Sequence, residues 1–173
     1  MGLFIDRIRE ITGLVKVASR LVVTPYTEIP GIVIASQPPS AGDALGTVGY
    51  NDLDVNGNPL PERGYIVGAK LIDPTDTALV ATVHIYSAKI PGTADNAALA
   101  HTAVDVRFWI TSIPFSVTTD VGAGKVSEVN DWDSCYYSPT RTLWWQFSTA
   151  GTPTVVVGLL PMVQFFIVPC SKP

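Results

Sequence analysis

The stretch DLDVNG, residues 52–57, has the residue types of a calcium-binding loop. In an EF-hand loop, oxygen ligands come from positions 1, 3 and 5, a glycine stands at position 6, and a bidentate glutamate closes the shell at position 12. The stretch matches these early positions, but Arg63 brings a positive charge to position 12, and Pro59 and Pro61 block the helix that normally follows. We therefore predict an ordered turn and a protruding polar loop, with no metal or other cofactor. The residues that would bind calcium if this loop held it are Asp52, Asp54 and Asn56.

Nucleophilic catalysis would need a histidine beside a hydroxyl or a thiol. The chain has two histidines, His84 and His101. His84 lies in the alternating stretch VHIY, so its side chain is expected on the face opposite Val83 and Ile85. Nothing in the sequence resembles the glycine-flanked serine of hydrolases or the spaced ligands of a zinc site. We predict that the protein is not an enzyme, and a hydrolase that uses His84 or His101 stays as an alternative.

Aromatic side chains that could form a binding surface concentrate between residues 132 and 145. Clusters of Trp and Tyr on β-sandwiches bind sugars or anchor protein interfaces. Trp144 and Trp145 are adjacent, and neighbouring residues of a strand point to opposite faces, so at most one of them is buried in a one-sided core. We expect the other to lie on an outer face. The candidate residues of this aromatic interface are Trp132, Tyr136, Tyr137 and Trp145.

The elements that must position these residues are short β-strands. From residue 14 onward, alternating apolar stretches rich in β-branched residues are separated by Gly, Pro, Asn or Asp. A short helix is predicted in DNAALAHT, residues 95–102, with Asp95 or Asn96 as its N-cap. Many short strands with turns between them indicate an all-β sandwich or barrel in a single domain, residues 15–173. The predicted strands are 15–24, 31–36, 64–73, 78–87, 105–115, 142–147 and 152–168, with a turn at 73–77.

Residues 1–14 are predicted to form an N-terminal arm outside the sandwich. Apolar residues at steps of four, three and four indicate a short helix, and an extended arm stays as an alternative. Because so short a helix is marginal in water by itself, we expect the arm to dock on its own domain or on a neighbour. The candidate contact residues are Phe4, Arg7, Ile8, Arg9, Ile11 and Val15.

Composition favours a protein that packs into an assembly. Hydrophobic residues make up 47% of the 173 residues and charged residues only 15%, which leaves much neutral surface. The net charge of −4 gives no support for nucleic-acid binding through a basic face. The most apolar run, residues 155–168, contains a proline and a glutamine and is too short to cross a membrane. We expect a soluble protein without a signal peptide, made in the cytoplasm.

Several short motifs, taken in order, resemble the jelly-roll head decoration (cement) proteins of tailed phages. PSAGDALG, residues 39–46, resembles the element that follows their first strands. Residues 64–105 resemble their central segment of two strands, a turn and a D-N-A-A motif, and residues 152–168 resemble their final strand. The resemblance does not extend to residues 1–20, to the stretch NDLDVNGNPLPERG at 51–64, or to the Trp-rich stretch.

This resemblance implies a jelly-roll-like antiparallel β-sandwich on the outer surface of a phage head. Such proteins usually form trimers and clamp neighbouring subunits of the major capsid protein, which is then the expected partner. The arm would contribute capsid or intersubunit contacts. The alternative is a tail, fibre or head-spike component that binds host glycan through an aromatic face.

Overall fold

The computed structural model describes residues 21–32, 40–75, 79–116, 118–122, 124–151 and 159–170, and these are mostly β-structure. The first strands along the chain are β1 (Val22–Val23), β2 (Thr27–Glu28), β3 (Ala44–Asn51), β4 (Arg63–Asp73) and β5 (Ala81–Tyr86). They are followed by α2 (Ala103–Phe108), β6 (Trp109–Phe115), β7 (Thr119–Asp120), β8 (Lys125–Val129), β9 (Ser134–Tyr137), β10 (Leu143–Thr149) and β11 (Met162–Pro169).

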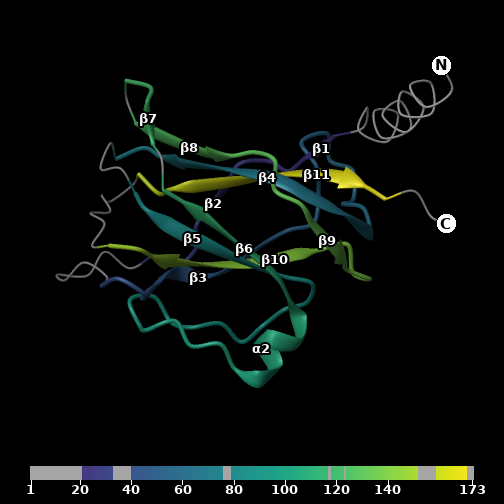
Figure 1. Cartoon of the computed structure of the whole chain (residues 1–173), viewed down its shortest axis with the longest axis horizontal. Coiled ribbons are helices and arrows are strands. Elements are labelled where there is room, and N and C mark those ends of the chain that lie inside the picture. Colours follow the sequence, from purple (N-terminus) through teal and green to yellow (C-terminus); the bar gives the residue numbers. More distant parts are fainter. Residues whose placement is uncertain are drawn as a thin grey trace, which may run out of the picture.

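The strands form two antiparallel sheets with the order of a jelly roll (Figure 1). The larger sheet runs β1-β11-β4-β8-β7, with β2 also paired to β11 and β9 to β4, and the smaller sheet runs β3-β10-β5-β6. We take β1 and β2 as one interrupted strand, and β8 and β9 as another. Leaving out the two-residue β7, which pairs only with β8 at the sheet edge, the larger sheet then holds the first, eighth, third and sixth strands of the chain, and the smaller sheet the second, seventh, fourth and fifth. Two Greek keys wound in this order make a jelly roll. The predicted all-β sandwich is therefore confirmed.

The predicted helix at residues 95–102 is wrong, because α2 begins only at Ala103. An antiparallel bridge joins Ala98 to Asp43 at the start of β3: Ala44 N–H donates to Ala97 O (2.8 Å) and Leu99 N–H donates to Gly42 O (3.0 Å). Pairing with a strand thus overrides the helix propensity of the alanines. The helix starts instead at a capping box, in which Thr102 and Asp105 each accept a hydrogen bond from the other's backbone N–H. The first residues of the predicted strand at 105–115 belong to this helix.

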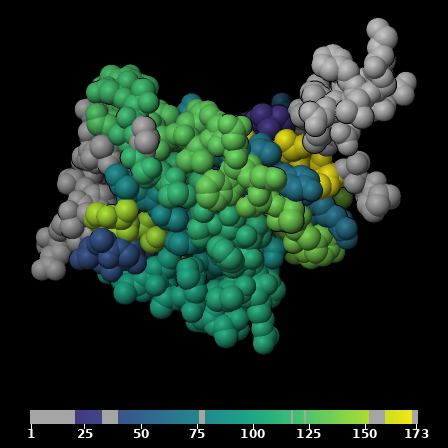
Figure 2. All heavy atoms as spheres, in the orientation of Figure 1, coloured from purple at the N-terminus to yellow at the C-terminus, as the bar shows by residue number. Residues whose placement is uncertain are grey.

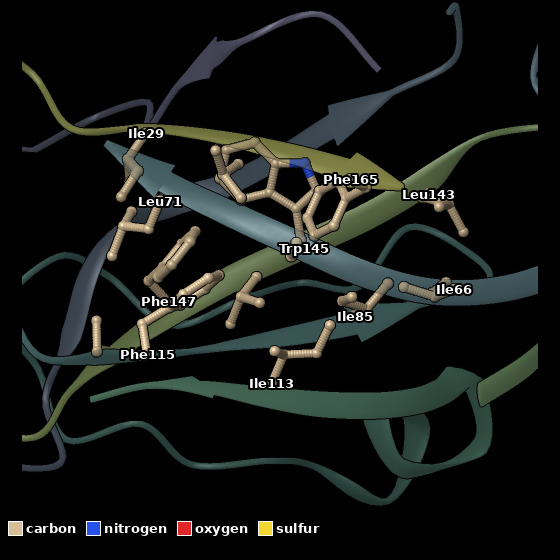
Figure 3. Packing of buried hydrophobic residues seen from close by; sticks show 14 of the residues in the cluster. Ile29, Ile66, Leu71, Ile85, Ile113, Phe115, Leu143, Trp145, Phe147 and Phe165 are labelled. Atoms are coloured by element: carbon tan, nitrogen blue, oxygen red, sulfur yellow. The ribbon is translucent and has the colours of Figure 1, made fainter. Parts of the chain in front are cut away.

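The core between the two sheets centres on aromatic side chains (Figure 3). Trp145 meets Phe147 edge to face with ring centroids 5.7 Å apart, and Phe165 of β11 lies 6.4 Å from Trp145 on the side of the larger sheet. The indole N–H of Trp145 donates to Asn51 Oδ1 at 2.8 Å, so its polar atom is satisfied inside the core. These contacts fix which face of each strand points inward.

Residues 87–108, which we call the covering segment, pack on the outer face of the smaller sheet and end in α2. In Figure 1 this segment lies on the far side of the smaller sheet from the larger one, and in Figure 2 it forms a projecting lobe. The buried side chain of Gln146 on β10 holds its middle, because Gln146 Oε1 accepts a hydrogen bond from Thr93 N–H (2.9 Å) and Gln146 Nε2 donates to Thr93 O. The covering segment thus buries part of the outer face of the smaller sheet, and polar side chains such as Gln146 lie beneath it.

Candidate functional site

The calcium-like stretch forms a turn in which the Asp54 carboxylate accepts hydrogen bonds from its own loop. Asp54 Oδ1 accepts hydrogen bonds from the backbone N–H of Asn56 and of Asn58, each 2.8 Å long, and both oxygens of Asp54 contact the Asn58 side-chain amide. These hydrogen bonds, above all the one from the Asn58 backbone, hold the pKa of Asp54 below its usual value. Gly57 completes the turn with a φ of 78°. The D-x-D-x-N-G pattern therefore builds an Asx-type turn here.

This loop packs against β1 and leaves apolar side chains in solvent. Val55 N–H donates to Val23 O at 2.8 Å, and Asn51 Nδ2 donates to Thr27 Oγ1 at 2.7 Å, so the loop follows the first strands of the larger sheet. Apolar side chains that gather on a surface mark interaction sites. We call the exposed apolar residues of this loop and of the chain around β1, each between 42% and 55% exposed, the edge surface: Leu21, Tyr26, Leu53 and Val55.

A pocket of about 290 Å³ lies beside the same loop. Val22, Leu60 and Pro169 give it apolar walls, and acidic and basic side chains both contribute to its lining. One of them, Arg63, has its guanidinium 4.7 Å from the centroid of the Tyr137 ring, a cation–π contact. The lining therefore carries both signs of charge.

The structure brings the two histidines together on the outer face of the smaller sheet. Their ring centroids lie 5.0 Å apart in an edge-to-face arrangement. His84 Nδ1 is 2.7 Å from Ser112 Oγ on β6, and His84 Nε2 is 2.9 Å from Ser148 Oγ on β10. Burial, and secondarily the neighbouring His101, lower the pKa of His84 from 6.5 to about 4. His84 is therefore neutral at neutral pH.

This arrangement is unfavourable for nucleophilic catalysis. Trp109 Nε1, which can only donate, is 3.1 Å from Ser112 Oγ. A hydroxyl that accepts from an indole is polarised to donate onward, which favours a hydrogen bond from Ser112 to His84 Nδ1. The hydrogen of neutral His84 then lies on Nε2 and points at Ser148, so this nitrogen cannot take a proton from Ser148. The proposed role of His84 as a base would need the other tautomer.

Asp105 and Tyr86 extend this polar cluster beneath the covering segment. The Tyr86 hydroxyl is 3.0 Å from His101 Nδ1, although the Tyr86 side chain is fully buried. Asp105 is also buried, and its Oδ1 has no hydrogen-bond partner. Burial, and secondarily the charge of Asp105, raise the pKa of Tyr86 above its usual value. The sequence signal for this cluster was the period-two placement of His84 and Tyr86 on one face of β5, but it could not show what covers that face.

The predicted aromatic interface is mostly wrong in its choice of residues. Trp145 has no exposed surface, and Tyr136 is buried with its hydroxyl donating to Pro61 O at 2.9 Å. Trp132 is half-buried against the core and donates to a threonine hydroxyl. Only Tyr137 is well exposed, at 50%. As expected, the adjacent tryptophans face opposite sides, and Trp144 is the outward one.

Trp144 belongs to a separate aromatic pair on the outer face of the smaller sheet. Its ring centroid lies 5.1 Å from that of Tyr50, which is more than half exposed. Lys89 Nζ lies 5.6 Å from the Trp144 ring centroid. The six candidate contact residues of the N-terminal arm, at positions 4 to 15, lie outside the described residues.

Comparison of the chain with protein-family models, curated proteins and solved structures gives no match. In the part of the chain that the structure describes, no helix is long and apolar enough to cross a membrane. No group of three or more His, Cys, Asp or Glu side chains that could hold a metal ion occurs among those same residues.

Proposed function

We propose that this protein is a structural virion protein that decorates the outer surface of a phage head and stabilises contacts between major capsid subunits. The observation that carries the proposal is the jelly-roll strand order, which is the fold that the resemblance to head decoration proteins implies. Jelly rolls serve in viral capsid and lectin domains. The Asp54 carboxylate and the two histidines are engaged in hydrogen bonds within the fold, which supports a binding role over a catalytic one.

The edge surface is the proposed contact with the capsid. Its residues lie in the chain around β1, the end strand in the order of the larger sheet, and in the loop that bonds β1; the described chain begins at Leu21, seven residues after the predicted arm ends. Burial of this apolar surface against the shell would favour binding, at roughly 25 cal/mol per Å² removed from water. A protein that binds the assembled shell but not free subunits stabilises the shell by mass action. A homotrimer would multiply these contacts.

The test is to add purified protein to capsids that lack it and to measure occupancy and the temperature at which the capsids disassemble. We expect the wild-type protein to bind and to raise that temperature. Val55→Asp and deletion of residues 1–14 should each weaken binding. Val121→Asp is the matched control, because Val121 is 62% exposed and lies beside β7, at the opposite end of the sheet order. Equal loss for the two aspartate variants would reject the edge surface, and no binding by the wild type would reject the function.

A second function, glycan binding by a tail or spike component, has one observation in its favour. The Tyr50–Trp144 pair offers exposed aromatic surface of the kind that sugars stack on. Saturable binding on a glycan array that Trp144→Ala abolishes would support it. Trp145→Ala does not test this function, because Trp145 lies in the core.

A further inference from the structure

The covering segment is attached to the smaller sheet in two parts that differ in chemistry. Residues 92–99 are held along β3 by backbone hydrogen bonds and by the Asp95 carboxylate, which accepts from Gly46 N–H at 2.5 Å, and the Gln146 side chain holds Thr93. Ala97 O accepts from Ala44 N–H at 2.8 Å, and Leu99 N–H donates to Gly42 O at 3.0 Å. Backbone and amide groups do not titrate, so mild acid leaves these bonds unchanged, and the titratable group of this part is the Asp95 carboxylate.

Residues 100–108, in contrast, place a histidine against β5. His101 Nδ1 lies 3.0 Å from the Tyr86 hydroxyl, and the His101 ring packs edge to face on His84. The end of this part is held by the backbone bond from Ser87 N–H to Phe108 O at 2.8 Å. A positive charge on His84 therefore lies directly against residues 100–108, through the contact with His101.

His84 is enclosed by groups that suit a neutral ring. Ser112 on β6 and Ser148 on β10 bond its two nitrogens, and neither can offer a negative charge. Protonation makes both nitrogens donors, so the hydroxyl that donates to the neutral ring must turn away. The titratable neighbours on the covering segment are His101, which is cationic when protonated, and Asp105, whose charge acts on Tyr86 of the same strand as His84. Burial and His101 both disfavour the charged ring.

We propose that residues 100–108 form an acid-released flap, which detaches from the smaller sheet when His84 is protonated while residues 92–99 stay attached. Proton linkage gives the direction of the effect of pH on flap opening. An imidazole in water has a pKa of 6.5, and in the closed state the pKa of His84 is about 4, so the open state binds the proton more tightly and acid favours it. These two values predict that the opening equilibrium constant rises about 20-fold from pH 7 to pH 5.

The proposal is tested on the full chain by amide hydrogen exchange at pH 7 and pH 5, corrected for the intrinsic effect of pH. The amides of Val106, which donates to Thr102 O, and of Ser87 report on the flap, and the Leu99 amide reports on the attached part. We expect protection at the flap to fall about 20-fold relative to Leu99. His84→Gln, which cannot be protonated, should abolish the fall. Equal loss of protection at all three amides, or no loss, would overturn the proposal.

A second measurement needs no variant and so does not depend on how well His84→Gln folds. Nitrogen NMR of the two imidazoles gives the titration midpoint and the tautomer of each ring. For His84 we expect a midpoint well below 6.5 and, in the neutral ring, a hydrogen on Nε2. A midpoint near 6.5 would refute the flap. In His101→Asn, where the second charge is missing, the midpoint of His84 should rise and the loss of protection at pH 5 should shrink.

Discussion

Gly49 is where the core leaves no space for a side chain, so Gly49→Ala is a sharp test of the packing around Trp145. A Cβ at this position would lie 2.5 Å from Cζ2 and 2.7 Å from Cζ3 of the Trp145 ring, far inside van der Waals contact. The indole cannot move away freely, because its N–H is bonded to Asn51 and its ring packs edge to face on Phe147. The clash must therefore displace β3 or force Trp145 off its rotamer.

Overpacking of this kind costs about 1–3 kcal/mol. Replacing glycine by alanine also restricts the unfolded chain, which returns about 0.4–1 kcal/mol where the backbone tolerates it. We therefore expect Gly49→Ala to lower the free energy of unfolding by about 1–2 kcal/mol. In a protein of this size that corresponds to a fall in Tm of about 2–8 °C. Urea unfolding, followed by tryptophan fluorescence, measures the free energy directly.

Gly151→Ala is the matched control, because a Cβ there would meet nothing within 4 Å. It should leave stability unchanged within about 0.5 kcal/mol. Trp145→Phe removes the ring atoms that cause the clash, so in the double variant the cost of Gly49→Ala should largely disappear. If Gly49→Ala matches the control, or if its cost adds to that of Trp145→Phe without coupling, the packing argument is refuted.

Three further predictions concern polar groups. First, acid should destabilise the wild type relative to His84→Gln. The fall in the pKa of His84 from 6.5 to about 4 corresponds to a loss of at most about 3 kcal/mol of folding stability in acid, and partial exposure of the ring reduces the expected loss to about 2 kcal/mol at pH 4.5. Urea unfolding at pH 7 and 4.5 measures it, and parallel pH profiles of the two proteins would refute it. Second, Ser138→Ala should cost about 1–3 kcal/mol in thermal or urea unfolding, because the buried Ser138 hydroxyl bonds Thr142 O at 2.8 Å and lies 3.2 Å from Ser87 O. Unchanged stability would show that these bonds contribute nothing. Third, millimolar calcium should leave Tm unchanged, because the Asp54 carboxylate is engaged within its own turn. A rise of many degrees would show a calcium site instead.

The fold was predictable because its signals are local. Alternation of apolar residues placed β4, β5 and β10 close to their observed bounds. The composition of residues 73–77 predicted a turn after β4, and the structure shows how it is held: the Asp73 carboxylate accepts hydrogen bonds from the backbone N–H of Thr75 and of Leu79, each 3.0 Å long. Period-two alternation and turn chemistry depend on a few neighbouring residues, so both can be recognised in a single sequence.

The predictions failed where contacts with a segment distant in the sequence determine the local structure. The alanines of residues 95–102 favour a helix locally, but they pair with the edge of β3, some 50 residues earlier in the chain. The choice between Trp144 and Trp145 could not be made from alternation, which fixes that they face opposite sides but not which side is the core. The surroundings of His84 were equally hidden, because Ser112 and Ser148 are brought to it by strand pairing across the smaller sheet.

The same polar residues that suggested chemistry turn out to stabilise the backbone, and this bears on function. Asp54 closes its own turn, Asp73 holds the turn after β4, and the Asp105 carboxylate caps α2. A side chain that satisfies backbone donors has fewer oxygens left for a metal or a substrate. The described chain also exposes apolar and aromatic side chains, among them those of the edge surface and of Tyr50. Burial of such side chains against a partner gains free energy, and this gain is the physical basis of the binding role that we propose.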